Sequence, residues 1–314
     1  MTETRPLEPE VATQAFPGWC CSYCGAALQA AAHGLVCAGE GRYFATDRGI
    51  HRLLPEDRHR ETRAFLELYQ RVRRDEGWRA EPGLPDVGPR HPRAALWRGR
   101  AERLDAGLLL AESVLGRAPW RALDVGAGCC WIAARLLERG HHVAAVDVNL
   151  DAEDGLAAGD VLLAKGASLE RAEAEMEALP LEPQGFDLVV AGASLHYPAA
   201  LARTLVELRR VTRRDGVLLV LDSPVYRRRV DGEAMVAERM SRQAERYGVR
   251  VPRESQSGYL VLPELRDTFA GAGWRLEVHR WPSPLRELLR DALEIVRHGR
   301  RTARFPILLG HRDG

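Results

Sequence analysis

Four short apolar runs after residue 120 alternate with helix-like segments, and this alternation constrains the fold more than any other feature of the chain. The runs are RALDVG (121–126), HVAAVD (142–147), FDLVVAG (186–192) and GVLLVLD (216–222). The segments that follow them are CWIAARLLERG, NLDAEDGLAAGD, PAALARTLVELRRVT and a longer polar stretch. Strands that alternate with helices form a parallel sheet with helices on both faces. The sequence therefore predicts a doubly wound α/β domain, completed by a helix at 262–273 and strands at 274–281 and 303–312.

The first predicted strand leads through Asp124 into a turn that contains Gly126 and Gly128, and then into a helix. Glycines suit this turn because it is tight and because a ligand there approaches the backbone closely. A dinucleotide-binding turn has the pattern G-x-G-x-x-G, but its third glycine position is Trp131 in this chain. The motif indicates a different ligand, and Asp124 can alternatively serve only as a helix cap.

The pattern D-x-G-x-G, one strand before a second strand that ends in Asp147, resembles the class I S-adenosylmethionine-dependent methyltransferases. Their motif has a further glycine where this chain has Cys130, so we expect the loop to be shaped differently there. Residues 174–197 are similar to the family's G-D-A-E-x-L-P-F-x-x-x-x-F-D-L-V segment, and residues 208–222 to its L-x-R-V-L-x-P-G-G-x-L-x-x-x-D segment. The resemblance covers about residues 120–224. It implies a doubly wound, seven-stranded, mostly parallel sheet of the Rossmann-like methyltransferase type.

The resemblance also implies that the chain binds S-adenosyl-L-methionine. Asp147 stands where the family's acid accepts hydrogen bonds from the ribose hydroxyls. Glu175 stands where an acid reaches the adenine amino group, but Glu173 and Glu177 compete for that role. The expected cofactor-binding residues are Asp124, Gly126, Ala127, Gly128, Asp147, Val148, Glu175, Met176 and Ser194.

In methyl transfer the cofactor supplies the reactive group, so the main role of the protein is to position the acceptor. His196 follows the fourth predicted strand, at the edge where open sheets bind ligands. We therefore predict His196 as the catalytic residue, acting as a base or orienting the acceptor, with a purely structural histidine as the alternative. Further pocket candidates are Tyr197, Asp222 and Tyr226, and, for the methionine carboxylate, Arg98 and Arg100, which can also simply face solvent.

Cys21, Cys24 and Cys37 have the spacing C-x2-C-x12-C, which is typical of a zinc ribbon up to its third ligand. Clustered cysteines without a secretory signal favour metal binding over disulfides. The unit resembles the N-terminal zinc module of the bacterial large-subunit rRNA guanine methyltransferases, whose histidine would align with Gly41. Bound zinc and a degenerate ribbon without metal both stay open, and the candidates for a fourth ligand are Cys20, His33 and Glu40.

The chain divides into four expected regions. A tail (1–18) precedes the zinc-ribbon-like unit (19–55), a helical region and linker (56–118), and a methyltransferase domain (119–314) with a lid insertion at about 224–262. No apolar run approaches the roughly 18 residues of a membrane span, and the N-terminus lacks an apolar signal region. We therefore expect a cytoplasmic protein without membrane contact; the sequence leaves its oligomeric state open.

Two functions follow from these features. One is methyl transfer to a small molecule or biosynthetic intermediate that reaches the site under the lid. The alternative is methylation of an rRNA or tRNA base, with the cysteine unit binding RNA. The ribbon resemblance favours RNA, whereas the net charge of +1 and the missing fourth ligand favour a small molecule. A third possibility is an inactive scaffold, which the intact acid and glycine set disfavours.

Overall fold

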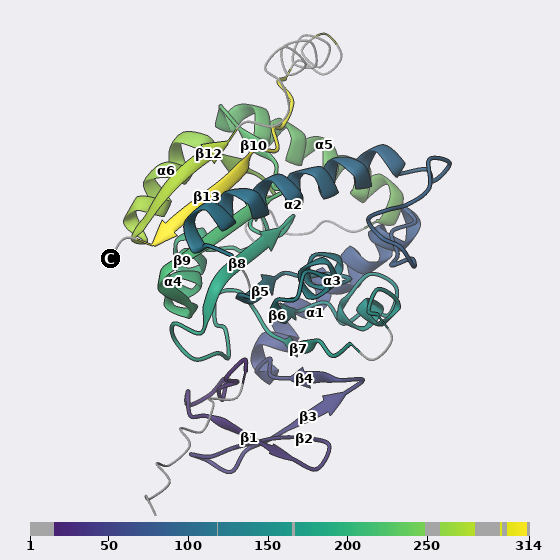
Figure 1. Ribbon diagram of the computed structural model, residues 1–314. Helices are drawn as coiled ribbons and strands as arrows, with labels where there is room; N and C mark the ends of the chain where they lie inside the picture. Colours follow the sequence, from purple (N-terminus) through teal and green to yellow (C-terminus); the bar gives the residue numbers. More distant parts are fainter. Residues whose placement is uncertain are drawn as a thin grey trace, which may run out of the picture.

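The structure is a computed structural model that describes residues 16–117, 119–164, 167–248, 258–279, 296 and 300–312. Its α/β part contains seven strands, namely β5 (Arg121–Val125), β6 (His142–Asp147), β7 (Glu170–Glu173), β8 (Phe186–Gly192), β9 (Thr212–Leu221), β12 (Trp274–His279) and β13 (Ile307–Arg312). Four more strands precede them, namely β1 (Leu28–Ala31), β2 (Gly34–Cys37), β3 (Tyr43–Asp47) and β4 (Ile50–Arg52). All eleven form one mixed sheet in the order β1-β2-β3-β4-β7-β6-β5-β8-β9-β13-β12 (Figure 1).

The α/β part of the sheet is doubly wound, as the sequence predicts. Strands β7, β6, β5, β8 and β9 pair in parallel, and β13 lies antiparallel between β9 and β12. From β5 the chain runs outward through β6 to β7 and then returns to β8 on the other side of β5. This reversal of direction opens a crevice at the carboxyl ends of β5 and β8, where sheets of this kind bind ligands.

The prediction of a seven-stranded sheet was incomplete, because the N-terminal hairpins extend the same sheet. Strand β4 pairs in parallel with β7, with Ile50 opposite Arg171 and Arg52 opposite Glu173. This pairing satisfies backbone groups that would otherwise be free at the β7 edge. The short strand β7 was not predicted, because its sequence, ERAE, contains three charged residues. Two of these charges are buried in ion pairs, Glu173 with Arg52 at 2.6 Å and Arg171 with Asp160 at 2.7 Å.

Two helices cover each face of the α/β sheet. Alternating strand residues such as Leu123 and Val125 pack with α4 (Leu201–Val211) and α6 (Leu262–Gly271) on one face. Residues of the opposite parity, such as Ala122, pack with α2 (Ala94–Leu115) and α3 (Trp131–Glu138) on the other. The period of two along each strand thus supplies both hydrophobic cores.

The segment after β6 does not form the predicted α-helix. It contains only a 3₁₀ helix, η1 (Leu156–Val161). In the residues before it, polar side chains form hydrogen bonds with backbone N–H groups. Asn149 Oδ1 accepts from the Asp151 N–H at 3.1 Å, and Asp151 Oδ1 accepts from the Glu153 N–H at 2.8 Å. Such local bonds compete with helix formation.

Helix α1 (Glu56–Asp75) and helix α5 (Arg229–Tyr247) both contribute side chains to the crevice. Helix α5 is the main element of the predicted lid, and a short parallel pair, β10 (Val225–Tyr226) and β11 (Leu260–Val261), flanks it. Residues 249–257 of the lid, the end of the 274–281 strand and the first 15 residues of the tail lie outside the described residues.

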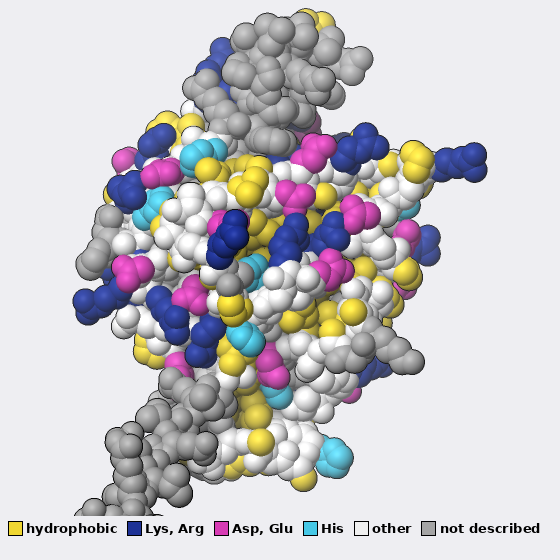
Figure 2. Space-filling model, in the orientation of Figure 1, with side chains coloured by type: hydrophobic (Ala, Val, Ile, Leu, Met, Phe, Trp, Pro, Cys, Tyr) yellow, Lys and Arg dark blue, Asp and Glu magenta, His cyan; other side chains and the backbone are white. Residues whose placement is uncertain are grey.

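Basic and acidic side chains are interspersed over the face of the molecule in Figure 2. No helix in the described parts of the chain is long and apolar enough to span a bilayer.

Candidate active site

A cavity of about 450 Å³ lies at the carboxyl ends of β5, β6 and β8. The glycine turn 126–128, the loop 147–149 and the segment 192–197 line its walls, while α1 and α5 add side chains from above the sheet. This volume falls within the range of small-molecule sites, about 300–1,000 Å³.

The glycine turn is shaped by close packing as well as by backbone conformation. Gly126 has φ +67°, and a Cβ there would lie 2.4 Å from Cβ of Ser194. Ser194, in turn, donates from Oγ to the Val125 carbonyl at 2.7 Å. Cys130, in the position of the family's further glycine, has φ +61° and is fully buried. Its sulfur fits because residue 159 is glycine, whose ideal Cβ would lie 3.1 Å from it.

Asp147 connects the glycine turn to the loop after β6. Its Oδ2 accepts from the Gly128 N–H at 2.8 Å, and its Oδ1 accepts from the Asn149 N–H at 2.7 Å. Burial raises the pKa of Asp147, and these two hydrogen bonds oppose the rise. Each carboxylate oxygen keeps further acceptor capacity toward the cavity. The arrangement can therefore accept hydrogen bonds from a ligand with adjacent hydroxyl groups.

Asp124 lies beneath the turn and does not line the cavity. It is 1% exposed, its Oδ2 accepts from the Ala133 N–H at 3.1 Å, and its Oδ1 has no hydrogen-bond partner among the described residues. Burial raises the pKa of Asp124 to about 7. In this structure the residue supports the start of α3.

A second cavity of about 370 Å³ adjoins the first and shares Asp147, Val148 and Met176 with it. Glu175 lines this cavity and is buried; both of its oxygens accept from Arg58 of α1, at 2.7 and 3.0 Å. Of the two competing acids, Glu177 also lines this cavity, whereas Glu173 is paired with Arg52.

His196 lines the main cavity and is 8% exposed. Its Nδ1 lies 3.2 Å from Oγ of Ser223, and burial, with smaller contributions from Arg239 and Arg100, lowers the pKa of His196 to about 3. The imidazole is therefore neutral at physiological pH and suits hydrogen bonding better than proton abstraction.

The other sequence candidates are placed as follows. Tyr197, Asp222, Tyr226 and Arg100 line the main cavity, whereas Arg98 is exposed and outside it. Asp222 takes a 2.5 Å hydrogen bond from Arg103 and a 3.8 Å ion pair from Arg100. Arg100 is thus the arginine of the WRGR segment that can meet a carboxylate in the cavity.

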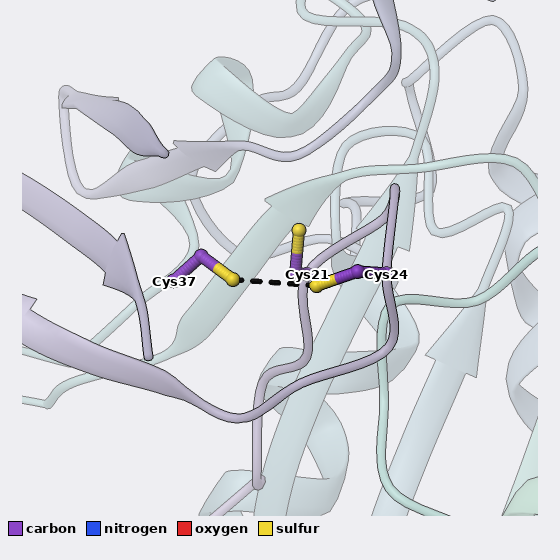
Figure 3. A group of neighbouring side chains, drawn as sticks. All are labelled: Cys21, Cys24 and Cys37. Atoms are coloured by element: carbon purple, nitrogen blue, oxygen red, sulfur yellow. Dashed lines mark hydrogen bonds between the residues drawn. The ribbon is translucent and has the colours of Figure 1, made fainter. Parts of the chain in front are cut away.

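The sulfur atoms of Cys21, Cys24 and Cys37 converge at the base of the N-terminal hairpins, all within 4.8 Å of one another (Figure 3). The Glu40 N–H donates to Cys37 Sγ at 3.4 Å and lowers the pKa of that thiol. Among the described residues, no fourth cysteine, histidine or acid joins the group. Cys20 Sγ lies 3.8 Å from the Gly18 carbonyl, and the Glu40 carboxylate pairs with Arg42. The three-cysteine spacing thus produces a metal-like cluster, but the expected fourth candidates lie elsewhere.

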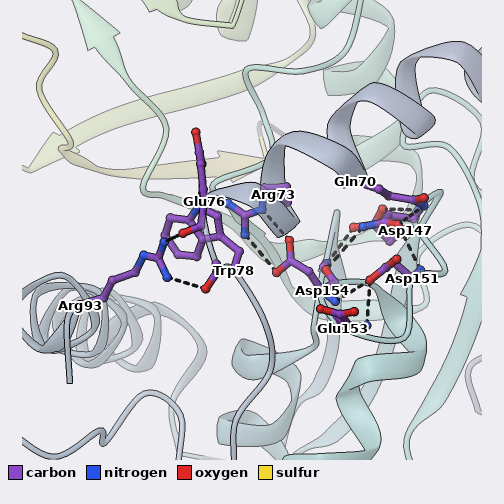
Figure 4. Close-up of polar contacts among 12 residues, drawn as sticks. Gln70, Arg73, Glu76, Trp78, Arg93, Asp147, Asp151, Glu153 and Asp154 are labelled. Carbon is purple, nitrogen blue, oxygen red and sulfur yellow. Dashed lines mark hydrogen bonds and ion pairs between the residues drawn. The ribbon is translucent and has the colours of Figure 1, made fainter. Parts of the chain in front are cut away.

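Helix α1 is attached to the loop after β6 by contacts that the sequence did not reveal (Figure 4). Arg73 donates two hydrogen bonds to the buried carboxylate of Asp154, at 2.5 and 3.0 Å. Gln70 Nε2 donates to Asn149 Oδ1 at 2.9 Å. The Arg73 guanidinium also lies 4.0 Å from the ring centre of Trp78. The hydrogen bonds of Arg73 and Gln70 join residues about eighty positions apart, and only the helical spacing of polar residues in α1 hints at them.

The doubly wound sheet, the glycine turn after its first α/β strand and the acid that ends the next strand together define a class I S-adenosylmethionine-dependent methyltransferase domain. Comparison with known proteins agrees: residues 123–220 match the family described as "Methyltransferase domain". The chain therefore contains such a domain.

A curated relative is the malonyl-(acyl-carrier protein) O-methyltransferase of Geobacter sulfurreducens, 33% identical over 184 residues. The match covers 58% of this chain and 64% of the relative, so it spans less than two thirds of that protein. Similar solved structures include 1,6-didemethyltoxoflavin-N1-methyltransferase of Burkholderia thailandensis, with 17% identity, a TM-score of 0.47 and coverage of 88% of this chain and 98% of that chain. A second is an S-adenosylmethionine-dependent methyltransferase of Mesorhizobium loti, with 17% identity, a TM-score of 0.46 and coverage of 67% of this chain and 100% of that chain.

Proposed function

We propose that this protein transfers a methyl group from S-adenosylmethionine to a small-molecule acceptor. The observation that carries the proposal is the main cavity, which is lined both by the glycine turn with Asp147 and by His196 with Tyr197. A nucleoside ligand beside the first group of residues would meet an acceptor beside the second within the same cavity.

The residues of the cavity suit the parts of this cofactor. In our proposal Asp147 holds the ribose hydroxyls, and Glu175, with the backbone of Met176, faces the adenine in the adjoining cavity. The glycine turn leaves room for the amino-acid end, since side chains there would fill the space. Arg100 lines the same cavity and binds the methionine carboxylate through a charge-assisted hydrogen bond.

The bound cofactor supplies an electrophilic methyl group, and the protein's own residues place the acceptor for an in-line attack. His196, held at Nδ1 by Ser223, presents a neutral ring to the acceptor and orients it. Phe65 and Tyr69 of α1 and Tyr197 of the loop after β8 form an aromatic cluster beside this position. These rings exclude water from the reacting groups.

Two observations favour a small acceptor over RNA. The curated relative acts on a carrier-bound malonyl group, as its name states. The cavity is lined in part by side chains of α1 and α5, and basic and acidic side chains are interspersed on the one face that Figure 2 shows. A folded RNA needs an open, positively charged path to the site.

Labelled methyl transfer tests the proposal. The full-length protein is incubated with methyl-labelled S-adenosylmethionine and either the RNA or the small-molecule fraction of an extract of the source cells. We expect label in the small-molecule fraction. Label in the RNA fraction alone would establish the RNA alternative, and no transfer to either fraction would refute the small-molecule acceptor.

We also propose that Cys21, Cys24 and Cys37 bind one zinc ion, which would stabilise the N-terminal hairpins by cross-linking them. Elemental analysis of the purified protein should find about one zinc per chain. Cys24→Ser should abolish it, whereas Cys20→Ser, a change in the same unit but outside the cluster, should retain it. Absence of zinc from the wild-type protein, or equal zinc in both variants, would contradict the site.

A further inference from the structure

We propose that the methyl acceptor is an organic carboxylate and that Arg239 binds it. The inference rests on the proposed function and assigns the substrate class of that same cavity. It follows from one cavity arginine that has no ion-pair or hydrogen-bond partner among the described residues, from the absence of a base beside it in the described cavity, and from a partly apolar extension of the site.

Arg239 lies on α5 where the main cavity meets a third cavity of about 420 Å³ between α1 and α5. It is half-buried, and no described residue forms an ion pair or hydrogen bond with it. The other arginines in the main cavity differ, since Arg73 is paired with Asp154, and Arg100 lies 3.8 Å from Asp222 and is assigned above to the methionine carboxylate. A half-buried guanidinium that lines a cavity and has no anionic partner among the described residues is suited to bind an anionic ligand.

The Arg239 guanidinium lies against the backbone of residue 258. A Cβ at residue 258 would lie 2.5 Å from Nη2 of Arg239, so glycine there leaves room for the charged group. The Gly258 N–H also donates to the His196 carbonyl at 3.1 Å. The cation therefore lies beside the segment that carries His196, on the acceptor side of the cavity.

The titratable groups near this position do not supply a base for an acceptor that must lose a proton. His196 has a pKa of about 3, and burial raises the pKa values of Tyr69 and Tyr197, so both tyrosines keep their protons at neutral pH. The Asp222 carboxylate is held by Arg103. An organic acid needs no base, because it is already ionised at neutral pH.

The reaction of a carboxylate balances without a proton transfer. A lone pair of one carboxylate oxygen forms the new bond to the methyl carbon, and the bond from that carbon to sulfur breaks. The bonding pair stays on sulfur, so the sulfonium becomes a neutral thioether and the acceptor a methyl ester. Each carboxylate oxygen has two lone pairs, so an oxygen that accepts from Arg239 retains one for the attack.

The third cavity accounts for the rest of such an acceptor. Its walls come mainly from the facing sides of α1 and α5 and include an apolar part formed by Phe65, Leu68, Val72, Val236 and Met240, together with polar side chains such as Glu76, Arg242 and Arg246. A carboxylate at Arg239 would leave the remainder of the molecule to extend between the two helices. The site thus fits an elongated acid with an apolar portion next to its carboxyl group.

The decisive experiment determines the type of bond that carries the transferred label. The full-length protein is incubated with methyl-labelled S-adenosylmethionine and the small-molecule extract, and the product is then treated with mild alkali. Carboxyl methyl esters release labelled methanol, whereas N-methyl and ether products do not. We expect alkali-labile label from the wild-type protein, reduced by about tenfold or more in Arg239→Gln and partly restored in Arg239→Lys.

Two controls separate a local effect from misfolding. Arg266→Gln, an equivalent change on the exposed side of α6, should transfer label within about twofold of the wild type, and calorimetry should give unchanged S-adenosylhomocysteine affinity for Arg239→Gln. Alkali-stable label, or full transfer by Arg239→Gln, would overturn this inference while leaving the methyltransferase proposal intact. Absence of transfer by the wild-type protein would refute both.

Discussion

Replacing Asp124 with asparagine should remove a large part of the pH dependence of the protein's stability. The Asp124 carboxyl group is 1% exposed, and burial raises its pKa from 3.8 to about 7. Below about pH 4 the group is neutral in both the folded and the unfolded state. As the pH rises from about 4 to about 7, the unfolded chain ionises this group while the folded chain resists, so the folded state loses stability.

The magnitude follows from the size of the shift. A difference of about 3 pKa units, at about 1.36 kcal/mol per unit, corresponds to about 4 kcal/mol once both states are ionised. Between about pH 5 and pH 8 the wild-type protein should lose about 2.5 kcal/mol of unfolding free energy from this group alone. The unpaired Oδ1 position would hold the new amide NH₂, which costs about 1–3 kcal/mol but at every pH alike.

Urea unfolding followed by circular dichroism, at both pH values, measures the effect. The free energy of Asp124→Asn minus that of the wild type should rise by about 2.5 kcal/mol from the lower to the higher pH, since other titrating groups cancel in the difference. A difference that stays constant within about 0.5 kcal/mol would show that Asp124 is not held as a buried, desolvated acid.

Three further predictions concern the cavity and its turn. Asp147→Ala should weaken S-adenosylmethionine binding by about tenfold or more in calorimetry, because hydrogen bonds to a charged acceptor are worth about 1.5–3 kcal/mol each; unchanged affinity would remove Asp147 from the site. His196→Ala should lower turnover more than cofactor affinity, and the wild-type rate should show no inflection from His196 between about pH 5 and 8, since its pKa is about 3; equal turnover would make the residue structural. In urea unfolding, the free energy of unfolding should be about 1 kcal/mol higher for Cys130→Gly than for Cys130→Ala. Residue 130 has a positive φ, which is unfavourable for alanine because of its Cβ but not for glycine. The reverse order would mean that the turn changes conformation in the alanine variant.

The sequence predicted well what depends on neighbouring residues. The apolar runs identified β5, β6, β8 and β9, and the predicted helix at 262–273 matches α6 closely. Strand β7 escaped detection because three of its four residues are charged, and Glu173 is neutralised by Arg52, which lies far away in the sequence. The predicted helix after β6 was wrong because Asn149 and Asp151 bond to the local backbone instead. The sequence predicted that His196 lies near a ligand. It could not predict that the side chain is buried and that burial keeps its imidazole ring neutral.

Local pattern thus determined the α/β class, the glycine turn and the acid at the end of β6, because strand period and turn geometry are properties of short segments. Tertiary structure alone decided that the cysteine hairpins join the sheet, since the pairing of Arg52 with Glu173 connects residues 121 positions apart. It also decided which arginines of the cavity meet a carboxylate and that Arg239 does not meet one among the described residues. Charge pairing depends on distances in space, and a linear order of residues does not contain them.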